Sequence, residues 1–307
     1  MIDEMTFLTT LYTLADDFFS TQPVVKRLGR KPSLTTSEVV TLSIFGQWAR
    51  FESERGFYRY ANRHLRSAFP RLPSRPQLNR LMRKNHDAIV AFFLYLAEKL
   101  HTDDTKHQIL DGSGVAVRNY KRRGRGWLAG DTEIGRCTRL GWYEGFNLIV
   151  AIGTTGNITG FGFATANRND TAVADSFLAL RRHPDPRFAS VGAWTGEPYI
   201  ADKGYTGAAN IKYWKAVYQA TVISPPQRRS KHAWSKSWRR WLASRRQIVE
   251  SVYFKLLRSF RLEHERPHDL LGFRARLAAK MALHNFCIWT NQEHGRANLA
   301  FAELVDW

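Results

Sequence analysis

The hydrophobic pattern of the chain changes near residue 105, and this change limits the folds that the chain can adopt. Before it, apolar residues recur at helical spacing in residues 33–51, 55–69 and 74–100. After it, short apolar runs bounded by turn residues alternate with amphipathic segments. The pattern therefore predicts an all-α region followed by an α/β region.

Local signals place breaks within the first region. Thr35 and Glu38 have the spacing of a capping box at a helix start. Pro70 ends the second helical segment, residues 72–76 form a stiff break, and the polar residues 101–107 are typical of a linker. We expect a helical domain over 1–105, a second domain over 106–290 and a C-terminal tail over 291–307.

The second region gives an ordered series of elements. Its runs predict, in order, three strands, a helix, a strand, a helix, a short strand and two long helices. They cover residues 107–117, 146–156, 157–166, 170–182, 198–202, 207–220, 221–226, 244–260 and 272–291. Gly156 and Asn157 favour a hairpin between the second and third strands. The order indicates an α/β fold with a mixed sheet flanked by helices, as in the ribonuclease-H-like fold.

The charge of the chain indicates a polyanionic partner. The formal net charge is +19 over 307 residues, and 44% of the residues are hydrophobic, which excludes a disordered chain. Residues 1–105 hold 15 Lys/Arg and 11 Asp/Glu, whereas the remaining residues hold 31 and 16. Nucleic acid is the first candidate partner and an acidic membrane surface the second.

Several other classes are disfavoured. The two cysteines, Cys137 and Cys287, lack the spacing of a zinc site or a disulfide framework, which fits a reduced, cytosolic setting. The longest apolar run, residues 88–97, is about half a membrane span. The acidic N-terminus does not have the form of a signal peptide, and the sequence contains no Walker-type phosphate loop.

Three acidic residues occupy distinctive places in the predicted elements. Asp111 and Asp202 each end an apolar strand run, and Glu250 interrupts the apolar face of a predicted helix, four residues after Arg246. Cleavage of a phosphodiester needs in-line attacking and leaving oxygens, which two Mg²⁺ ions held by carboxylates can supply. Taken singly, each aspartate can be a turn residue and Glu250 can pair with Arg246 on a helix surface.

The motifs around these acids resemble the catalytic domain of DDE-type transposases of bacterial insertion sequences, over about residues 105–290. "ILDGSGVAV" looks like the first-aspartate strand, "YIADKGYTG" the second-aspartate motif and "RRQIVESVYFKL" the glutamate helix. The resemblance implies a catalytic, metal-binding set of Asp111, Asp202 and Glu250. It also implies two Mg²⁺ ions, with Mn²⁺ as a substitute, and action on nucleoid DNA in a bacterial cytoplasm.

The glutamate helix departs from the family pattern at two places. Ala243 stands where the family has a tyrosine and Leu257 where it has a lysine, and Arg258 is the expected substitute for that lysine. The helical N-terminal domain resembles a region that binds DNA ends or forms dimers. The implied partners are double-stranded DNA, both element ends and target, and further copies of the chain.

Basic and aromatic stretches supply candidate DNA contacts. Residues 118–127 hold five cations after the first strand, and Trp234, Trp238 and Trp241 recur at helical spacing in a basic stretch. The expected DNA-binding residues are Arg118, Lys121, Arg122, Arg123, Arg125, Lys203, Tyr205, Arg246, Arg258, Trp234 and Trp238. The alternatives are solvated loops for the cations and core packing for the tryptophans, and Asp170 is interpreted as a helix cap.

Four functions remain open at this point. The first is a transposase that nicks DNA at element ends and transfers the freed 3′-hydroxyl into target DNA. The second is a ribonuclease-H-like nuclease with the same acids but no strand transfer. A non-catalytic DNA-binding derivative and a basic RNA-binding structural protein are the third and fourth, and the latter does not explain the placing of the acids.

Overall fold

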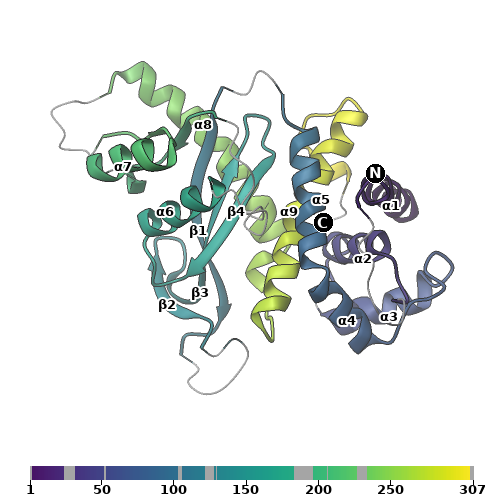
Figure 1. Cartoon of the computed structure of the whole chain (residues 1–307). Coiled ribbons are helices and arrows are strands. Elements are labelled where there is room, and N and C mark those ends of the chain that lie inside the picture. Colours follow the sequence, from purple (N-terminus) through teal and green to yellow (C-terminus); the bar gives the residue numbers. More distant parts are fainter. Residues whose placement is uncertain are drawn as a thin grey trace. The chain divides into compact units, whose positions relative to one another are not determined.

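The structure, a computed structural model, contains two compact units. They are a helical unit, Met1–Leu96 with Leu271–Trp307, and a sheet unit, Ala97–Leu270 (Figure 1). The residues described are 2–23, 32–51, 53–102, 106–121, 128, 130–182, 196–205, 207–226 and 234–304.

The helical unit contains six long helices and a final turn in its described residues. Their bounds are α1 Glu4–Ser20, α2 Thr36–Trp48, α3 Glu54–His64, α4 Arg75–Lys84, α5 His86–Lys99, α9 Leu270–Glu293 and the 3₁₀ turn η5 Phe301–Glu303. The expected capping box starts α2: Thr35 accepts from the Glu38 amide, and the Glu38 side chain accepts from the Thr35 amide. The segment 74–100 forms two helices, α4 and α5.

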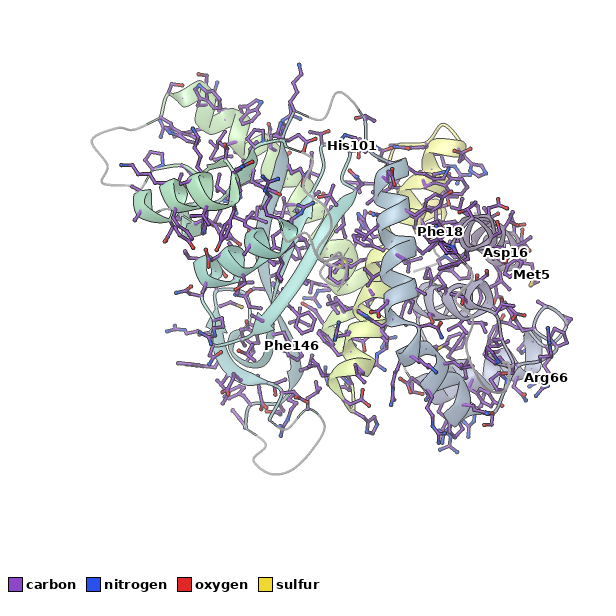
Figure 2. All side chains as sticks on the ribbon, in the orientation of Figure 1. Met5, Asp16, Phe18, Arg66, His101 and Phe146 are labelled. Atoms are coloured by element: carbon purple, nitrogen blue, oxygen red, sulfur yellow. The ribbon has the colours of Figure 1, made fainter. Side chains whose placement is uncertain are left out.

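The helical unit is closed by residues from both ends of the chain. Phe7 stacks on Trp48 with ring centroids 4.4 Å apart and meets the edge of Phe286 at 5.1 Å. Trp48 Nε1 donates to the Leu304 carbonyl at 2.9 Å. In Figure 2, Phe18 marks a second aromatic contact, in which its ring stacks on Tyr95 at 4.6 Å. Residues 271–304 therefore belong to the core of this unit.

These packing units divide the chain differently from the predicted domains. The expected boundary at residue 290 lies inside α9, and the residues expected as a tail include η5, where Phe301 is buried. Hydrophobic periodicity identifies α9 as a helix but does not show which core it joins. The role of the N-terminal region in binding DNA ends or in dimerisation remains a prediction.

The sheet unit has a mixed six-stranded sheet in its described residues. The strands are β1 Gln108–Arg118, β2 Glu133–Cys137, β3 Gly141–Ile152, β4 Ile158–Thr165, β5 Tyr199–Ala201 and β6 Val222–Ile223. Their order is β2-β3-β1-β5-β6, and β4 also pairs with β3. β3 pairs antiparallel with β1, β2 and β4. β5 lies parallel to β1, and β6 lies parallel to β5.

Helices flank this sheet, as expected for the ribonuclease-H-like fold (Figure 1). They are α6 Asp170–Arg181, α7 Ala208–Tyr218 and α8 Lys236–Phe254, followed by a π-helical turn at Lys255–Ser259. Phe177 of α6 and Trp214 of α7 pack with Leu110 and Tyr199 in one buried cluster. Phe146 of β3, labelled in Figure 2, packs edge-on against Phe163 of β4 at 5.0 Å.

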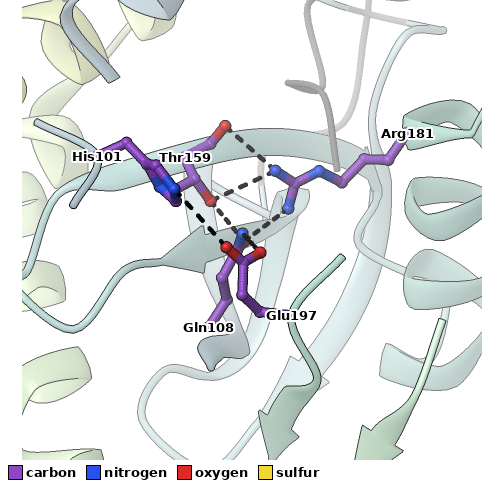
Figure 3. Close-up of polar contacts among 5 residues, drawn as sticks. All are labelled: His101, Gln108, Thr159, Arg181 and Glu197. Atoms are coloured by element: carbon purple, nitrogen blue, oxygen red, sulfur yellow. Dashed lines mark hydrogen bonds and ion pairs between the residues drawn. The ribbon is translucent and has the colours of Figure 1, made fainter. Parts of the chain in front are cut away.

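A buried arginine ties three elements of the sheet unit together (Figure 3). Arg181, at the end of α6, donates to Gln108 Oε1 of β1 at 3.0 Å and to Thr159 of β4 at 3.4 Å. Gln108 in turn donates to Glu197, just before β5, at 3.2 Å. The network fixes α6 across the strands whose ends carry the candidate site.

Three local predictions need correction. β2 was not predicted, because its five residues carry no apolar run. α6 is capped by Asn169, whose side chain accepts from the Ala172 amide, so Asp170 is not the cap. α8 begins at Lys236, eight residues earlier than expected, and includes Trp238 and Trp241 but not Trp234.

Among the described residues, no helix is both long enough and apolar enough to cross a bilayer.

Candidate active site

Asp111 and Asp202 follow a pair of residues in the parallel strands β1 and β5, with Asp111 inside β1 and Asp202 just beyond the end of β5. Leu110 of β1 is paired with Ala201 of β5, and each aspartate is the next residue along its chain. The charges of both aspartates act on the Tyr205 hydroxyl, and Tyr205 packs in the same α6–α7 core as Leu110 and Ala201. Strand pairing thus brings together two acids that are 91 positions apart in the sequence.

Asp111 is the most perturbed acid of the site. Burial raises the pKa of its carboxyl to about 7, and the negative charges of Asp202 and Asp170 raise it further. A hydrogen bond from the Gly112 amide and the charge of Arg246 oppose this rise. Such a carboxyl is costly to ionise unless a cation approaches it.

Asp202 begins a tight turn that leads into α7. Its Oδ1 accepts from the Gly204 amide at 2.6 Å, and its carbonyl accepts from the Tyr205 amide at 3.2 Å. Gly204 lies close to this carboxylate, because a Cβ built on Gly204 would be 2.8 Å from Asp202 Oδ1. The glycine of the second-aspartate motif therefore lets the turn wrap around the carboxylate.

α8 places Glu250 between two residues that reach Asp111. Tyr253 donates its hydroxyl to the Asp111 carbonyl at 2.9 Å, and the charge of Arg246 acts on the Asp111 carboxyl. Arg246, Glu250 and Tyr253 follow one another at i, i+4 and i+7, which is one face of a helix. Glu250 is exposed on that face, so its carboxylate is available to a ligand from solvent.

Asp170 is an acid of this site whose place sequence reasoning missed. Its Oδ1 accepts from Asn147 Nδ2 of β3 at 2.9 Å. Cβ atoms built on Gly112 and Gly204 would lie 3.5 Å and 3.6 Å from its two carboxylate oxygens. The signal was the pair Asn169–Asp170: both can cap a helix, and because Asn169 does so, Asp170 is left for another role.

Tyr205 lies inside the site and not on its surface, which corrects the expectation of a DNA-facing side chain. It is 1% exposed, and its hydroxyl is buried without a hydrogen-bond partner. That oxygen would be 3.0 Å from a Cβ on Gly112. Burial, and then the charges of Asp111, Asp170 and Asp202, raise the pKa of Tyr205, so the hydroxyl stays protonated and can donate.

The donor set fits a hard divalent cation. Carboxylates are the preferred protein ligands of Mg²⁺. Here the negative charges of Asp170 and Asp202 both act on the Asp111 carboxyl. Within the described ranges, no three His, Cys, Asp or Glu side chains are already close enough to hold one ion. One oxygen of Asp202, Oδ1, accepts from the amide of Gly204 in its own loop.

The expected DNA-binding cations fall into three groups. Arg118 pairs with Glu144 at 3.1 Å and Arg258 with Glu263 at 3.1 Å, so both are engaged within the sheet unit. Lys121 and Lys203 are exposed. Arg122, Arg123 and Arg125 lie outside the described residues.

Trp234, just before α8, and Trp238 and Trp241 within it form a ladder of rings that is exposed at its centre. Trp238 is 53% exposed and contacts Trp234 and Trp241, with ring centroids 5.9 Å and 5.3 Å away. Trp241 is half-buried and packs edge-on against His107 at 5.3 Å. The packing alternative therefore applies to Trp241, whereas Trp238 exposes its ring to solvent.

The architecture and the acids at the sheet edge define a ribonuclease-H-like domain of the DDE type. A family model described as "Transposase DDE domain" matches residues 102–286, and the chain belongs to this family. The match includes all four acids of the site. No curated protein matches the chain significantly.

Proposed function

We propose that this protein cuts DNA at the ends of its own element and joins the freed 3′-hydroxyl to target DNA. The observation that supports this most strongly is the convergence on Asp111. Asp202 follows β5, the strand paired with β1. From α8, Tyr253 donates to the Asp111 carbonyl and the charge of Arg246 acts on the Asp111 carboxyl, and Glu250 lies between these two residues in the sequence. The family match over residues 102–286 is consistent with this reading.

Asp111, Asp202 and Glu250 are the residues that we assign to a divalent-metal site, with two Mg²⁺ ions and Mn²⁺ as a substitute. Bound metal would supply charge stabilisation to phosphoryl oxygens and an activated nucleophile. Asp111, half-buried within β1, is the fixed acid of the set. Glu250, exposed on α8, is the acid with room to adjust when DNA is bound.

The two reactions need the same residues. In the first, a water oxygen bonds to phosphorus, the bond from phosphorus to the 3′-oxygen breaks, and that oxygen takes a proton to become a hydroxyl. In the second, this 3′-oxygen bonds to a target phosphorus, and the displaced target oxygen takes the proton. One phosphodiester replaces another, so strand transfer requires no external energy source.

DNA would be held by basic and aromatic side chains of the sheet unit. Lys121 and Lys203 are exposed, and Trp238 offers an open indole face for stacking on an unpaired base. Arg118 and Arg258 would have to exchange their acidic partners for phosphates. We expect two copies or more to act together on nucleoid DNA in the cytoplasm, because two element ends must be joined.

The test uses a labelled duplex carrying the DNA that flanks the chain's own coding sequence, with Mg²⁺ or Mn²⁺. Wild-type protein should nick the duplex at the element end and produce joined products on gels. Asp202→Asn should reduce both products at least a hundredfold. Asp131→Asn, which changes an exposed acid elsewhere in the sheet unit, is the matched control and should leave them unchanged.

The same gels separate the alternatives. Hydrolysis without joined products would identify a nuclease on this fold. Tight, salt-sensitive binding without cleavage under either metal would identify a non-catalytic DNA-binding protein. Cleavage retained in Asp202→Asn would rule out the proposed catalytic set.

A further inference from the structure

The space beside Asp111 and Asp202 has a second side, formed by α6 and by the turn after β5. Asp170 opens α6 and Tyr205 closes that turn. The backbone between them stays open because Gly112 and Gly204 carry no side chain. A Cβ on Gly112 would be 3.0 Å from the Tyr205 hydroxyl and 3.5 Å from Asp170 Oδ1, and a Cβ on Gly204 would be 3.6 Å from Asp170 Oδ2.

Asp170 is held in place by contacts that leave part of its carboxylate available. Asn147 Nδ2 donates to Oδ1 at 2.9 Å and to the Arg168 carbonyl at 3.2 Å, which fixes the chain just before α6. Asn169 caps the helix, so Asp170 does not have to. Thr171 donates to the Gly204 carbonyl at 3.4 Å and links the first turn of α6 to the loop of Asp202. The chain thus positions this carboxylate without a structural ion pair in the described residues.

The buried Tyr205 hydroxyl points independently to a ligand in the same space. A phenol that is 1% exposed and lacks a partner has lost its hydrogen bonds to water, which carries a free-energy cost. A hydrogen-bond acceptor would remove this cost, and a phosphate oxygen is such an acceptor. The cluster of acids and the unsatisfied donor therefore favour the same kind of occupant.

We propose that Asp170 is a fourth carboxylate of the divalent-cation site and that the Tyr205 hydroxyl donates to an oxygen bound beside it. The inference rests on the proposed function, because it adds a residue to the metal site formed by Asp111, Asp202 and Glu250. It assigns to α6, and not only to β1, β5 and α8, a direct part in holding the cation.

The test measures Mn²⁺ binding to the full chain without DNA, by isothermal titration calorimetry and by the electron paramagnetic resonance signal of free Mn²⁺. Asp170→Asn keeps the shape of the side chain and an oxygen for Asn147, and should weaken Mn²⁺ binding at least tenfold. Asp202→Asn should weaken it at least as much, and Asp131→Asn should bind as the wild type does. Circular dichroism and thermal melts in a chelator would confirm that each variant is folded.

A second variant distinguishes a ligand from a residue that only supports the fold. Asp170→Cys should bind Cd²⁺ with a thiolate charge-transfer absorption that exceeds the background of Cys137 and Cys287 in the wild type, because Cd²⁺ prefers sulfur ligands. A merely structural aspartate would not produce this absorption. Tyr205→Phe should keep Mn²⁺ affinity within a few fold, because its hydroxyl contacts the bound oxygen and not the ion.

The outcomes separate this inference from the proposed function. If Asp202→Asn loses Mn²⁺ binding while Asp170→Asn binds as the wild type and Asp170→Cys shows no added absorption, Asp170 is not a ligand and the three-acid site stands. If neither substitution changes Mn²⁺ binding, the proposed metal site itself is wrong and this inference fails with it.

Discussion

Asp111 shows how a single residue can join stability to function. Its side chain leaves a strand whose preceding residues are buried, and its carboxyl meets two other acids and one arginine. Burial and like charges favour the protonated form, whereas a bound cation favours the ionised form. The metal-free protein therefore carries an unfavourable group that its proposed ligand would stabilise.

This leads to a prediction for the metal-free protein. The folded state raises the pKa of Asp111 from 3.8 to about 7, so it holds this proton more tightly than the unfolded chain does. The resulting stabilisation is fully present below the unfolded value and is lost as the pH rises through about 7, at about 1.4 kcal/mol per pKa unit. The free energy of unfolding, measured by urea denaturation in a chelator, should fall over this interval, and Asp111→Asn should flatten that fall.

The comparison of variants decides whether Asp111 is the group responsible. Asn mimics the protonated acid, so Asp111→Asn and wild type should agree best at the acidic end and diverge towards neutral pH. Asp131→Asn should follow the wild-type curve throughout. Parallel curves for wild type and Asp111→Asn would show that another group causes the pH dependence.

At the scale of elements, periodicity and turn chemistry predicted most of the sheet unit. The runs around residues 107–117, 146–166 and 198–202 predicted β1, the β3–β4 hairpin and β5, and the amphipathic segments predicted α6, α7 and α8. β2 escaped because it is an edge strand with exposed Glu133 and Ile134, whose side chains carry no alternation signal. Its existence depends on pairing with β3, which local sequence does not encode.

The sequence predicted those residues of the candidate site that end apolar runs. It did not predict the residue that had two possible roles. Asp111 and Asp202 stand out because each is an acid that ends an apolar run, although β1 itself continues past Asp111 to Arg118. Asp170 had an ordinary explanation as a cap, and only the observed hydrogen bond from the Ala172 amide to the Asn169 side chain removes it. Tyr205 shows the reverse: a tyrosine in a polar turn suggests a surface role, yet packing against α6 and α7 buries it.

The buried network of Arg181 provides a prediction for the sheet unit as an assembly of elements. Arg181→Met would remove one of the two donors to Gln108 Oε1 and the guanidinium donor to the Thr159 carbonyl. It would also remove a buried charge that is balanced in part by Glu197. Loss of one partner from such a network costs about 3–5 kcal/mol. We expect a corresponding loss in the free energy of unfolding of the sheet unit, measured by urea denaturation.

Arg182→Met is the matched control, since this neighbouring side chain is exposed and contacts Gln219 near the surface. It should change the free energy of unfolding by about 0.5 kcal/mol or less. Equal effects of the two substitutions would mean that Arg181 does not hold α6 to the sheet.

At the scale of the whole molecule, the charge of +19 and the exposed aromatic ladder should make separable contributions to DNA binding. Cations on phosphates release counterions, so their contribution depends on salt, whereas stacking on bases does not. α8 carries both kinds of group, because exposed Lys236, Arg239 and Arg240 surround the open ring of Trp238.

We therefore predict different salt responses for two substitutions on this helix. Arg240→Ala should lower affinity for duplexes of any sequence and reduce the slope of log affinity against log salt by about 1. Trp238→Ala should leave that slope unchanged but weaken binding to DNA with unpaired bases by about 1–3 kcal/mol. Fluorescence anisotropy over a salt series, with blunt duplexes and duplexes carrying single-stranded ends, measures both effects.

Trp142→Ala is the control for Trp238→Ala, because Trp142 of β3 is equally exposed, at 57%, but lies outside the basic helix. It should bind both substrates as the wild type does. Equal losses for the two tryptophan variants would show that any exposed indole of this chain contributes, and an effect of Trp238→Ala on blunt duplexes alone would exclude base stacking. A loss of affinity seen only for Trp238→Ala and only with single-stranded ends would place the start of α8 against the unpaired end of the DNA. Glu250 lies on this same helix.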